Sequence, residues 1–238
     1  YKPFTNTIRF MSINGTHVAS SYDPMIINFN GNLNLHGRSS KDTLSTGKAH
    51  MTVGVEMQAS SAKESIFNNN GVFNLEREAA NPAVNSTDDR LGVYLIGMTA
   101  MVEDYAQYQP LTGNAISNRY SDITYRPWAS EMNNNGTINV TGKESIGMYG
   151  VGLGTTVYNG TPTNKNATIN LGADGTMGMY LDEGAKGYNY GTITTVGSPK
   201  KAVGIVVRKG AEFTNEGTVN INSAGGYAFF KANGGVIK

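Results

Sequence analysis

The residues of this chain that could do chemistry are a few adjacent acids, three histidines and one glycine-rich run. Glycoside hydrolysis needs two carboxylates at a defined separation, and calcium binding needs several clustered oxygen ligands. The histidines lack the spacing of metal ligands, and the run from Gly150 to Gly154 lacks the strand-to-helix context of a nucleotide-binding loop. We therefore predict no catalytic residue, no metal site and no cofactor. The adjacent acids are Asp88-Asp89, Glu103-Asp104 and Asp182-Glu183.

The composition narrows the class of protein. The chain has 238 residues, no cysteine and a net charge of +1, so disulfides and thiolate zinc sites are excluded. No basic run exceeds Lys200-Lys201, and we predict no nucleic-acid partner. No apolar run reaches the length of a membrane span and no signal peptide is visible, so this part of the chain is not expected to be membrane-embedded.

Two phrases alternate along the chain and define an internal repeat. The first is Gly-Thr-Ile-Asn, as at 136–139, and the second is Gly-Met-Tyr, as at 147–149. Further copies of the first phrase begin at 167, 191 and 217, and looser copies begin at 31 and 71. A third phrase, an aromatic residue or Met followed by Asn and Gly, closes most units, at 67–71, 132–136, 188–191 and 213–217. Self-similarity of this kind is the signature of a repeat architecture.

Each unit contains three short apolar stretches separated by Gly, Asn and Asp, which favours three strands and three corners. Within the phrases apolar and polar residues alternate, as where Ile138 and Val140 flank Asn139, and a period of two is typical of strands. The one candidate helix is the stretch from Ala59 to Phe67. We expect glycine at the corners because it permits positive φ. A sandwich of antiparallel hairpins is the rival fold, but the Asn-Gly dipeptides occur at one fixed phase of the repeat, which favours a coil.

A single unit cannot bury its apolar face, so we predict that the units stack at roughly 4.8 Å per coil. The predicted fold is all-β, a right-handed parallel β-helix (solenoid) over 1–238 with loop insertions. Equivalent residues should then lie over one another. Tyr149 and Tyr180 should stack as a ladder. The predicted inward column is Ile138, Ile169, Ile193 and Val219, and the predicted outward row, or amide ladder at a corner, is Asn139, Asn170 and Asn220.

These phrases resemble the passenger regions of bacterial type V autotransporters, most closely the large outer-membrane adhesins of fusobacteria. The shared wording is Asn-x-Gly-x-Ile-Asn followed by Gly-Met-Tyr, carried here by 133–149 and its equivalents at 166–180 and 189–217. The resemblance implies an exported cell-surface stalk, anchored in the outer membrane by a C-terminal barrel that this sequence lacks. It also implies attachment to a host-cell receptor (glycan or protein) or to another bacterium's surface. Because the repeat is cut at both ends, we expect the sequence to be a piece of a longer protein.

Specificity is expected in the irregular part of the chain. The alternation breaks down at 98–130, which we predict to be a loop insertion, and a smaller insertion at 36–50 is expected to be a solvated loop. Insertions in a solenoid often form its binding face, and Tyr, Trp and Arg are enriched at binding hot spots. Alternatively, these aromatic residues pack against the solenoid as a satellite core. The candidate binding residues are Tyr105, Tyr108, Tyr120, Tyr125, Arg126 and Trp128.

The sequence is compatible with three functions. We predict a non-enzymatic adhesin fragment, and a monomer because no coiled-coil stalk is visible. The first alternative is a polysaccharide lyase or hydrolase, because β-helices include pectin-degrading enzymes. His36-Gly37 matches one element of the polygalacturonase set, but the Asn-Thr-Asp and Arg-Ile-Lys elements are absent. The second alternative is a passive spacer within the stalk.

Overall fold

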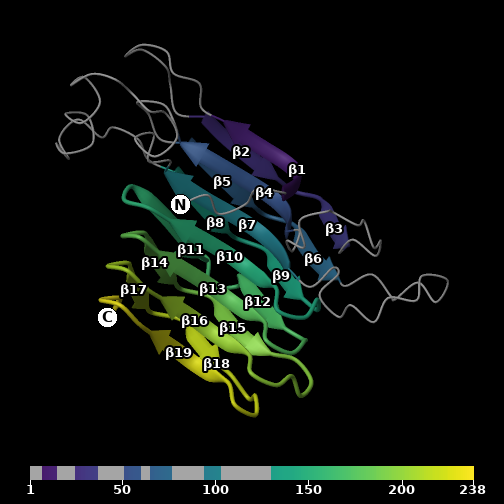
Figure 1. Ribbon diagram of the computed structural model, residues 1–238. Helices are drawn as coiled ribbons and strands as arrows, with labels where there is room; N and C mark the ends of the chain where they lie inside the picture. The colour runs from purple at the N-terminus through teal and green to yellow at the C-terminus, as the bar shows by residue number, and fades with distance from the viewer. Residues whose placement is uncertain (1–6, 15–24, 37–50, 60–64, 77–93, 103–129) are drawn as a thin grey trace, which may run out of the picture.

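The computed structural model describes residues 7–14, 25–36, 51–59, 65–76, 94–102 and 130–238. Within these ranges the chain forms twenty strands and no helix. Consecutive strands enter three different sheets in turn, and each strand pairs in parallel with equivalent strands of the neighbouring coils. Figure 1 shows the coils following one another from the first, in purple, to the last, in yellow. The fold is a parallel β-helix, as the repeat predicts.

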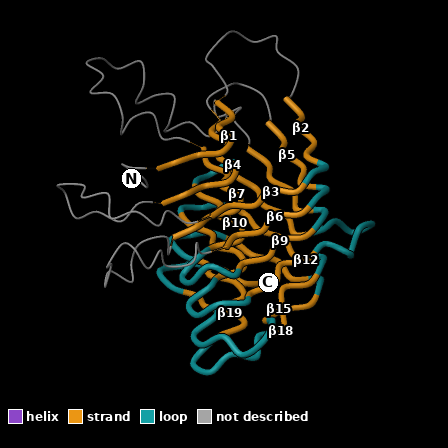
Figure 2. The backbone as a smooth tube through the Cα atoms, turned by 90° about the vertical axis from the view of Figure 1, so that its right-hand side faces the viewer, coloured by secondary structure: helices purple, strands orange, loops and turns teal. Residues whose placement is uncertain are grey.

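The three sheets are named A, B and C, and their strands are given in spatial order. Sheet A contains β1 (Thr7–Asn14), β4 (Met51–Ala59), β7 (Tyr94–Val102), β10 (Ile146–Val151), β13 (Met177–Asp182), β16 (Val203–Val207) and β19 (Tyr227–Lys231). Sheet B contains β2 (Met25–Phe29), β5 (Ser65–Asn69), β8 (Ser130–Asn134), β11 (Thr155–Asn159), β14 (Lys186–Asn189), β17 (Glu212–Asn215) and β20 (Val236–Ile237). Sheet C contains β18 (Thr218–Asn220), β15 (Thr192–Thr195), β12 (Thr168–Leu171), β9 (Thr137–Val140), β6 (Val72–Glu76) and β3 (Asn32–His36). Figure 2 shows these strands, in orange, stacked along the coil axis with loops between them.

Each sheet directs apolar side chains into the core, in columns that run from coil to coil. In sheet C, Ile138, Ile169 and Ile193 are fully buried and in register, and the partly buried Val219 continues the column. The predicted inward column is therefore confirmed. Sheet A contributes Met98, Met148 and Met179 to the same core, and sheet B contributes Phe67, Met132, Val157 and Phe213. Burying each such side chain stabilises the coil by about 1.5–3 kcal/mol.

Asparagine side chains form several ladders between the described coils, of which one lies inside a corner (the inner ladder) and another contains the predicted row (the outer ladder). The inner ladder is formed by the last residues of the sheet B strands. Its rungs are side-chain amide hydrogen bonds of 2.8–2.9 Å between successive coils. The outer ladder includes the predicted row: Asn170 Nδ2 donates to Asn139 Oδ1 at 2.8 Å, and Thr194 then separates Asn170 from Asn220. The inner ladder consists of Asn69, Asn134, Asn159, Asn189 and Asn215.

The glycines that follow the inner ladder are there for close approach rather than for positive φ. A Cβ added to Gly136 would lie 2.1 Å from the carbonyl oxygen of Gly71, and one added to Gly191 would lie 2.2 Å from that of Ala167. Neither glycine is among those with positive φ. Our expectation of positive φ at these corners is thus wrong, because the constraint is the carbonyl of the coil beneath. Positive φ occurs instead in the turns, as at Gly175 and Gly210.

The described strands also test the predicted helix and the predicted insertions. The candidate helix from Ala59 to Phe67 is wrong at its described ends, since Ala59 ends β4 and Ser65 begins β5. The strand pattern prevails there because successive side chains of β5 alternate between buried and half-buried. Of the predicted insertion at 98–130, residues 98–102 belong to β7 and Ser130 begins β8. The insertion at 36–50 likewise starts on the last residue of β3.

Candidate functional site

The binding residues predicted from the sequence lie outside the described residues; they are Tyr105, Tyr108, Tyr120, Tyr125, Arg126 and Trp128. The acid pairs Asp88-Asp89 and Glu103-Asp104 lie outside them as well. A functional surface in the described part of the chain must therefore come from the coils and their turns.

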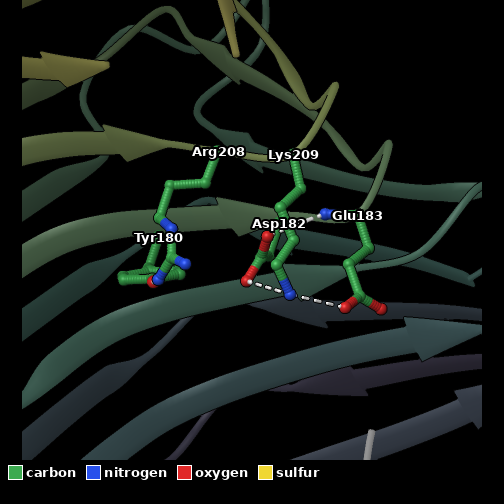
Figure 3. A network of polar contacts seen from close by, with 5 residues as sticks. All are labelled: Tyr180, Asp182, Glu183, Arg208 and Lys209. Carbon is green, nitrogen blue, oxygen red and sulfur yellow. Dashed lines mark hydrogen bonds and ion pairs between the residues drawn. The ribbon is translucent and has the colours of Figure 1, made fainter. Parts of the chain in front are cut away.

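The acid pair Asp182-Glu183 is bound by a cation from the next coil (Figure 3). Lys209 Nζ donates a hydrogen bond of 2.9 Å to Glu183 Oε1 and lies 3.9 Å from Asp182 Oδ2. The hydrogen bond from Lys209 to Glu183 raises the pKa of this lysine above its usual value. These carboxylates join successive turns of the solenoid. Among the described residues, no group of three or more His, Cys, Asp or Glu side chains is arranged to hold a metal ion.

The glycine-rich run at 150–154 is a turn between β10 and β11. Gly152 and Gly154 have φ of 91° and 87°, and the Thr155 hydroxyl donates to the Val151 carbonyl at 2.7 Å. The run leads into a strand rather than a helix. It therefore has no helix N-terminus to direct at a phosphate.

The outer face of sheet A carries two columns of side chains that point away from the core. The first column includes Ile146 and Met177, and the second includes Tyr149 and Tyr180. The rings of the two tyrosines meet edge to face with centroids 5.2 Å apart. The predicted tyrosine ladder is thus confirmed, with the two methionines beside it turned inward. Towards the C-terminal coils the first column continues as Met177, Val203 and Tyr227, and the second as Tyr180, Val206 and Phe230.

These six side chains line a groove of about 670 Å³ across β13, β16 and β19. Val206 lies on its floor, 5% exposed, while Tyr227 and Phe230 are 57% and 43% exposed. Large apolar side chains exposed together on one surface are typical of an interaction site. Tyr, Phe, Met and Arg are also the residue types enriched at protein interfaces.

The edges of the groove carry positive charge and no lining carboxylate. Lys200 and Lys201 lie on the turn before β16, and Arg208 lies directly after that strand. Lys201 adopts a φ of 55°, and its backbone N–H donates to the Ala224 carbonyl at 2.9 Å, which ties this edge to the next coil. The groove is thus an apolar surface bounded at both ends of the strand by cations.

Tyr180 connects the apolar surface to one of these cations. Arg208 Nη1 donates a hydrogen bond to the Tyr180 hydroxyl, and the guanidinium carbon lies 6.0 Å from the ring centroid. Figure 3 shows the guanidinium beside the tyrosine, separate from the Lys209 ion pair. A guanidinium near an aromatic ring is held by the ring quadrupole as well as by hydrogen bonds, so Arg208 is positioned at the edge of the groove.

The outer face of sheet A changes along the molecule. In the earlier coils the corresponding side chains are covered: Val53 and Ile96 are 0% and 1% exposed, and Tyr149 is 5% exposed. They form a second apolar cluster separate from the core. Over β13, β16 and β19 the described part of this outer face is open as a groove.

Sequence reasoning missed this groove, although part of its signal was present. The Gly-Met-Tyr phrase and its relatives place one residue inward and the next outward, which identifies Tyr180, Val206 and Phe230 as one outward column. The basic turn residues carry no such phrase. They become neighbours of the column through the coil register alone.

Sheet B carries a smaller aromatic row on its outer face. Tyr158 and Tyr188 stack with centroids 4.9 Å apart and planes at 13°, and Tyr190 continues the row at the corner. Desolvation, then the charge of Glu216, raises the pKa of Tyr190. The ring faces are largely turned to one another, so this row serves coil packing better than ligand stacking.

The described residues include no helix that is long and apolar enough to cross a membrane. A scan against protein-family models, a search of curated proteins and a search of solved structures each found no match to this chain.

Proposed function

We propose that this chain is a non-catalytic segment of a cell-surface adhesin, a β-helical stalk that attaches its bearer to host cells or to partner bacteria. The observation that carries the proposal is the open, cation-edged apolar groove over β13, β16 and β19. The resemblance of the repeat phrases to autotransporter passengers supplies the cellular setting: export, and anchoring at the outer membrane by a translocator outside this sequence.

The groove supports a binding role for the stalk itself. A purely passive spacer needs only polar side chains on its outer faces, since exposed apolar clusters promote association. The part of the predicted insertion between β7 and β8, residues 103–129, belongs to the same proposal as a second contact region. The two are distinguished by experiment, because one lies on the described coils and the other outside them.

The chemistry of the described acids supports binding over hydrolysis. General acid–base cleavage of a glycosidic bond uses two carboxylates facing the scissile bond. Asp182 and Glu183 are instead engaged by Lys209, and the groove lining contains no carboxylate. Polyuronide cleavage remains the alternative function. A reducing-sugar assay on polygalacturonate tests it, and we expect no release above a heat-inactivated control.

The proposal is tested by attachment of the purified fragment to cultured epithelial cells and to a panel of bacteria. Three variants separate the regions: Tyr227→Ala with Phe230→Ala in the groove, Tyr125→Ala with Trp128→Ala in the predicted loop, and a fragment lacking 103–129, the part of that insertion between β7 and β8. We expect saturable binding that falls at least tenfold in one of the first two variants while β-type circular dichroism is unchanged. Binding to no cell type, or binding untouched by all three changes, would refute the adhesive role.

A further inference from the structure

We infer that the groove on sheet A binds an acidic protein segment in extended conformation, with apolar side chains between two carboxylates about six residues apart. The inference rests on the proposed binding function and names its partner class. It is argued from the charges at the groove edges, the nature of its lining and the length of β16.

The charges require an anionic partner with two separated groups. Lys200 and Lys201 stand at one end of β16 and Arg208 at the other. Lys201 has a positive φ, so the extended chain between the two edges runs from its neighbour Ala202 through the five residues of β16 to Arg208, which is six steps. At roughly 3.3 Å per residue of parallel strand, these steps span about 20 Å. A partner that meets both edges therefore carries carboxylates at about this separation.

The lining favours peptide side chains over a sugar chain. Between the two edges the groove presents Met177, Val203, Val206 and Phe230, which offer no hydrogen-bonding group. The hydroxyl of Tyr180 already accepts a hydrogen bond from Arg208. A polysaccharide lying there would find only the Tyr227 hydroxyl, the Asn233 amide and the Tyr180 O–H donor, so most of its hydroxyl groups would lose water without gaining partners, which is costly. Alternating apolar side chains of an extended segment would bury their surface at no such cost.

The arrangement of charge also favours a peptide over a lipid. An acyl chain carries its anionic group at one end only, and would leave one edge of the groove unmatched. In an extended segment residues i, i+2, i+4 and i+6 face the same side. Two acids at the ends of this series and two apolar residues between them match the two cationic edges and the apolar floor.

The direct test is fluorescence-anisotropy titration of the whole fragment with a labelled peptide containing Glu-Ser-Val-Ser-Phe-Ser-Glu. Comparison peptides replace both glutamates by lysine, or bring them to adjacent positions. We expect the parent peptide to bind at least tenfold more tightly than either comparison, and its affinity to fall as salt rises. Equal binding of the lysine peptide would overturn the charge argument, and equal binding of the peptide with adjacent acids would overturn the spacing.

Variants of the fragment locate the contact. Lys200→Glu combined with Lys201→Glu should reduce affinity at least tenfold. The matched control Lys143→Glu combined with Lys165→Glu changes the same net charge on exposed residues away from the groove and should leave affinity within twofold. Equal losses in both double variants would refute binding at the groove.

Two other ligand classes test the assignment of a protein partner, and the cell assay separates this inference from the adhesive role. Phosphatidylserine vesicles and polygalacturonate are titrated in parallel, and tighter groove-dependent binding of either one than of the peptide overturns the protein assignment. If cell attachment depends on Tyr227 and Phe230 while the acidic peptide does not bind, the partner class is wrong and the adhesive role stands. If the peptide binds but cells do not, the groove inference holds and the adhesive role fails.

Discussion

Replacing Asn159 with alanine should unfold part of the solenoid, because this side chain is the middle of the buried asparagine ladder. Asn159 is fully buried, accepts a hydrogen bond from Asn134 Nδ2 at 2.8 Å and donates to Asn189 Oδ1 at 2.8 Å. It also donates to the Thr192 carbonyl at 3.3 Å. Alanine removes all three hydrogen bonds and leaves the carboxamide oxygen of Asn189 without this donor in a buried corner.

The expected loss of stability in Asn159→Ala follows from the hydrogen-bonding groups that the substitution leaves without a partner. A buried polar group without a partner costs about 1–3 kcal/mol, and each remaining lost bond contributes about 1 kcal/mol net. The free energy of unfolding should therefore fall by about 2–5 kcal/mol. The control is Asn170→Ala in the outer ladder, which loses a hydrogen bond of similar length, 2.8 Å to Asn139. Water can replace that bond at a partly exposed site, so we expect a loss below about 1 kcal/mol.

Urea unfolding followed by far-ultraviolet circular dichroism measures both variants. Coils contact only their neighbours, so unfolding of a solenoid need not be two-state. Amide hydrogen exchange therefore accompanies the titration and should show lost protection in β11 and β14 for Asn159→Ala. Equal losses for the inner and outer variants would show that burial does not decide the strength of these ladders, and our reasoning about the corner would be wrong.

Three other predictions concern the coil contacts. Gly191→Ala should lower the free energy of unfolding by about 1–3 kcal/mol in urea titration, because its Cβ would lie 2.2 Å from a carbonyl oxygen of the coil below. In the control Gly172→Ala the nearest atom to the new Cβ is 3.3 Å away, and the free energy of unfolding should change little. Ile169→Ala, at a fully buried position of the inward column, should cost about 2–5 kcal/mol by the same measurement, and a loss under 1 kcal/mol would contradict that column. The hydrogen bond from Lys238 lowers the pKa of Glu212 below its usual 4.5, so the stabilisation by the ionised carboxylate is present above that value and is lost as pH falls through the lowered pKa. The difference in stability between the parent protein and Glu212→Gln should therefore vanish in acid. A difference that persists at pH 2 would contradict the assignment.

The inward columns could be predicted because local alternation and repetition agree. In the phrase Gly-Thr-Ile-Asn the isoleucine has polar neighbours on both sides, so its direction follows from the strand period alone. The copies then stack correctly if equivalent residues of the phrase lie at the same height in successive coils. The register confirms this, because Ile169 pairs with Ile138 and with Ile193.

The phase of sheet B was less secure, and one residue shows why. In the sequence the first residue of the third phrase, an aromatic residue or Met, is Phe67, Met132, Tyr188 and Phe213. The register places Gly187, not Tyr188, in that inward column, and Tyr188 faces outward beside Tyr158. The asparagine of the ladder lies two residues after Phe67 but one residue after Tyr188. Measuring from this asparagine, which is buried in each coil from β5 to β14, identifies the correct phase.

The groove could not be predicted, because its parts come from turns that share no phrase. Lys200 and Lys201 belong to a turn before β16, and Ala224 and Gly225 belong to the turn one coil later. The distance between them in space is set by one coil spacing, whereas their distance in sequence depends on how many residues each turn contains. Turn lengths differ between coils, so alignment of the repeat does not bring these residues together.

The distribution of residue types over the solenoid explains why its outer face can specialise. Inward positions stay apolar from coil to coil, and the inner corner keeps asparagine, because each coil must satisfy the next. The second outward column of sheet A changes freely, from Glu56 through Tyr149 to Val206 and Phe230, at one register position. At its exposed positions, such as Phe230 and the neighbouring Tyr227, substitutions usually shift stability by no more than about 0.5 kcal/mol, whereas Glu56, Tyr149 and Val206 are buried. Binding specificity can therefore change there while the coils stay folded, and loss of ligand binding in a groove variant reports on contact rather than on unfolding.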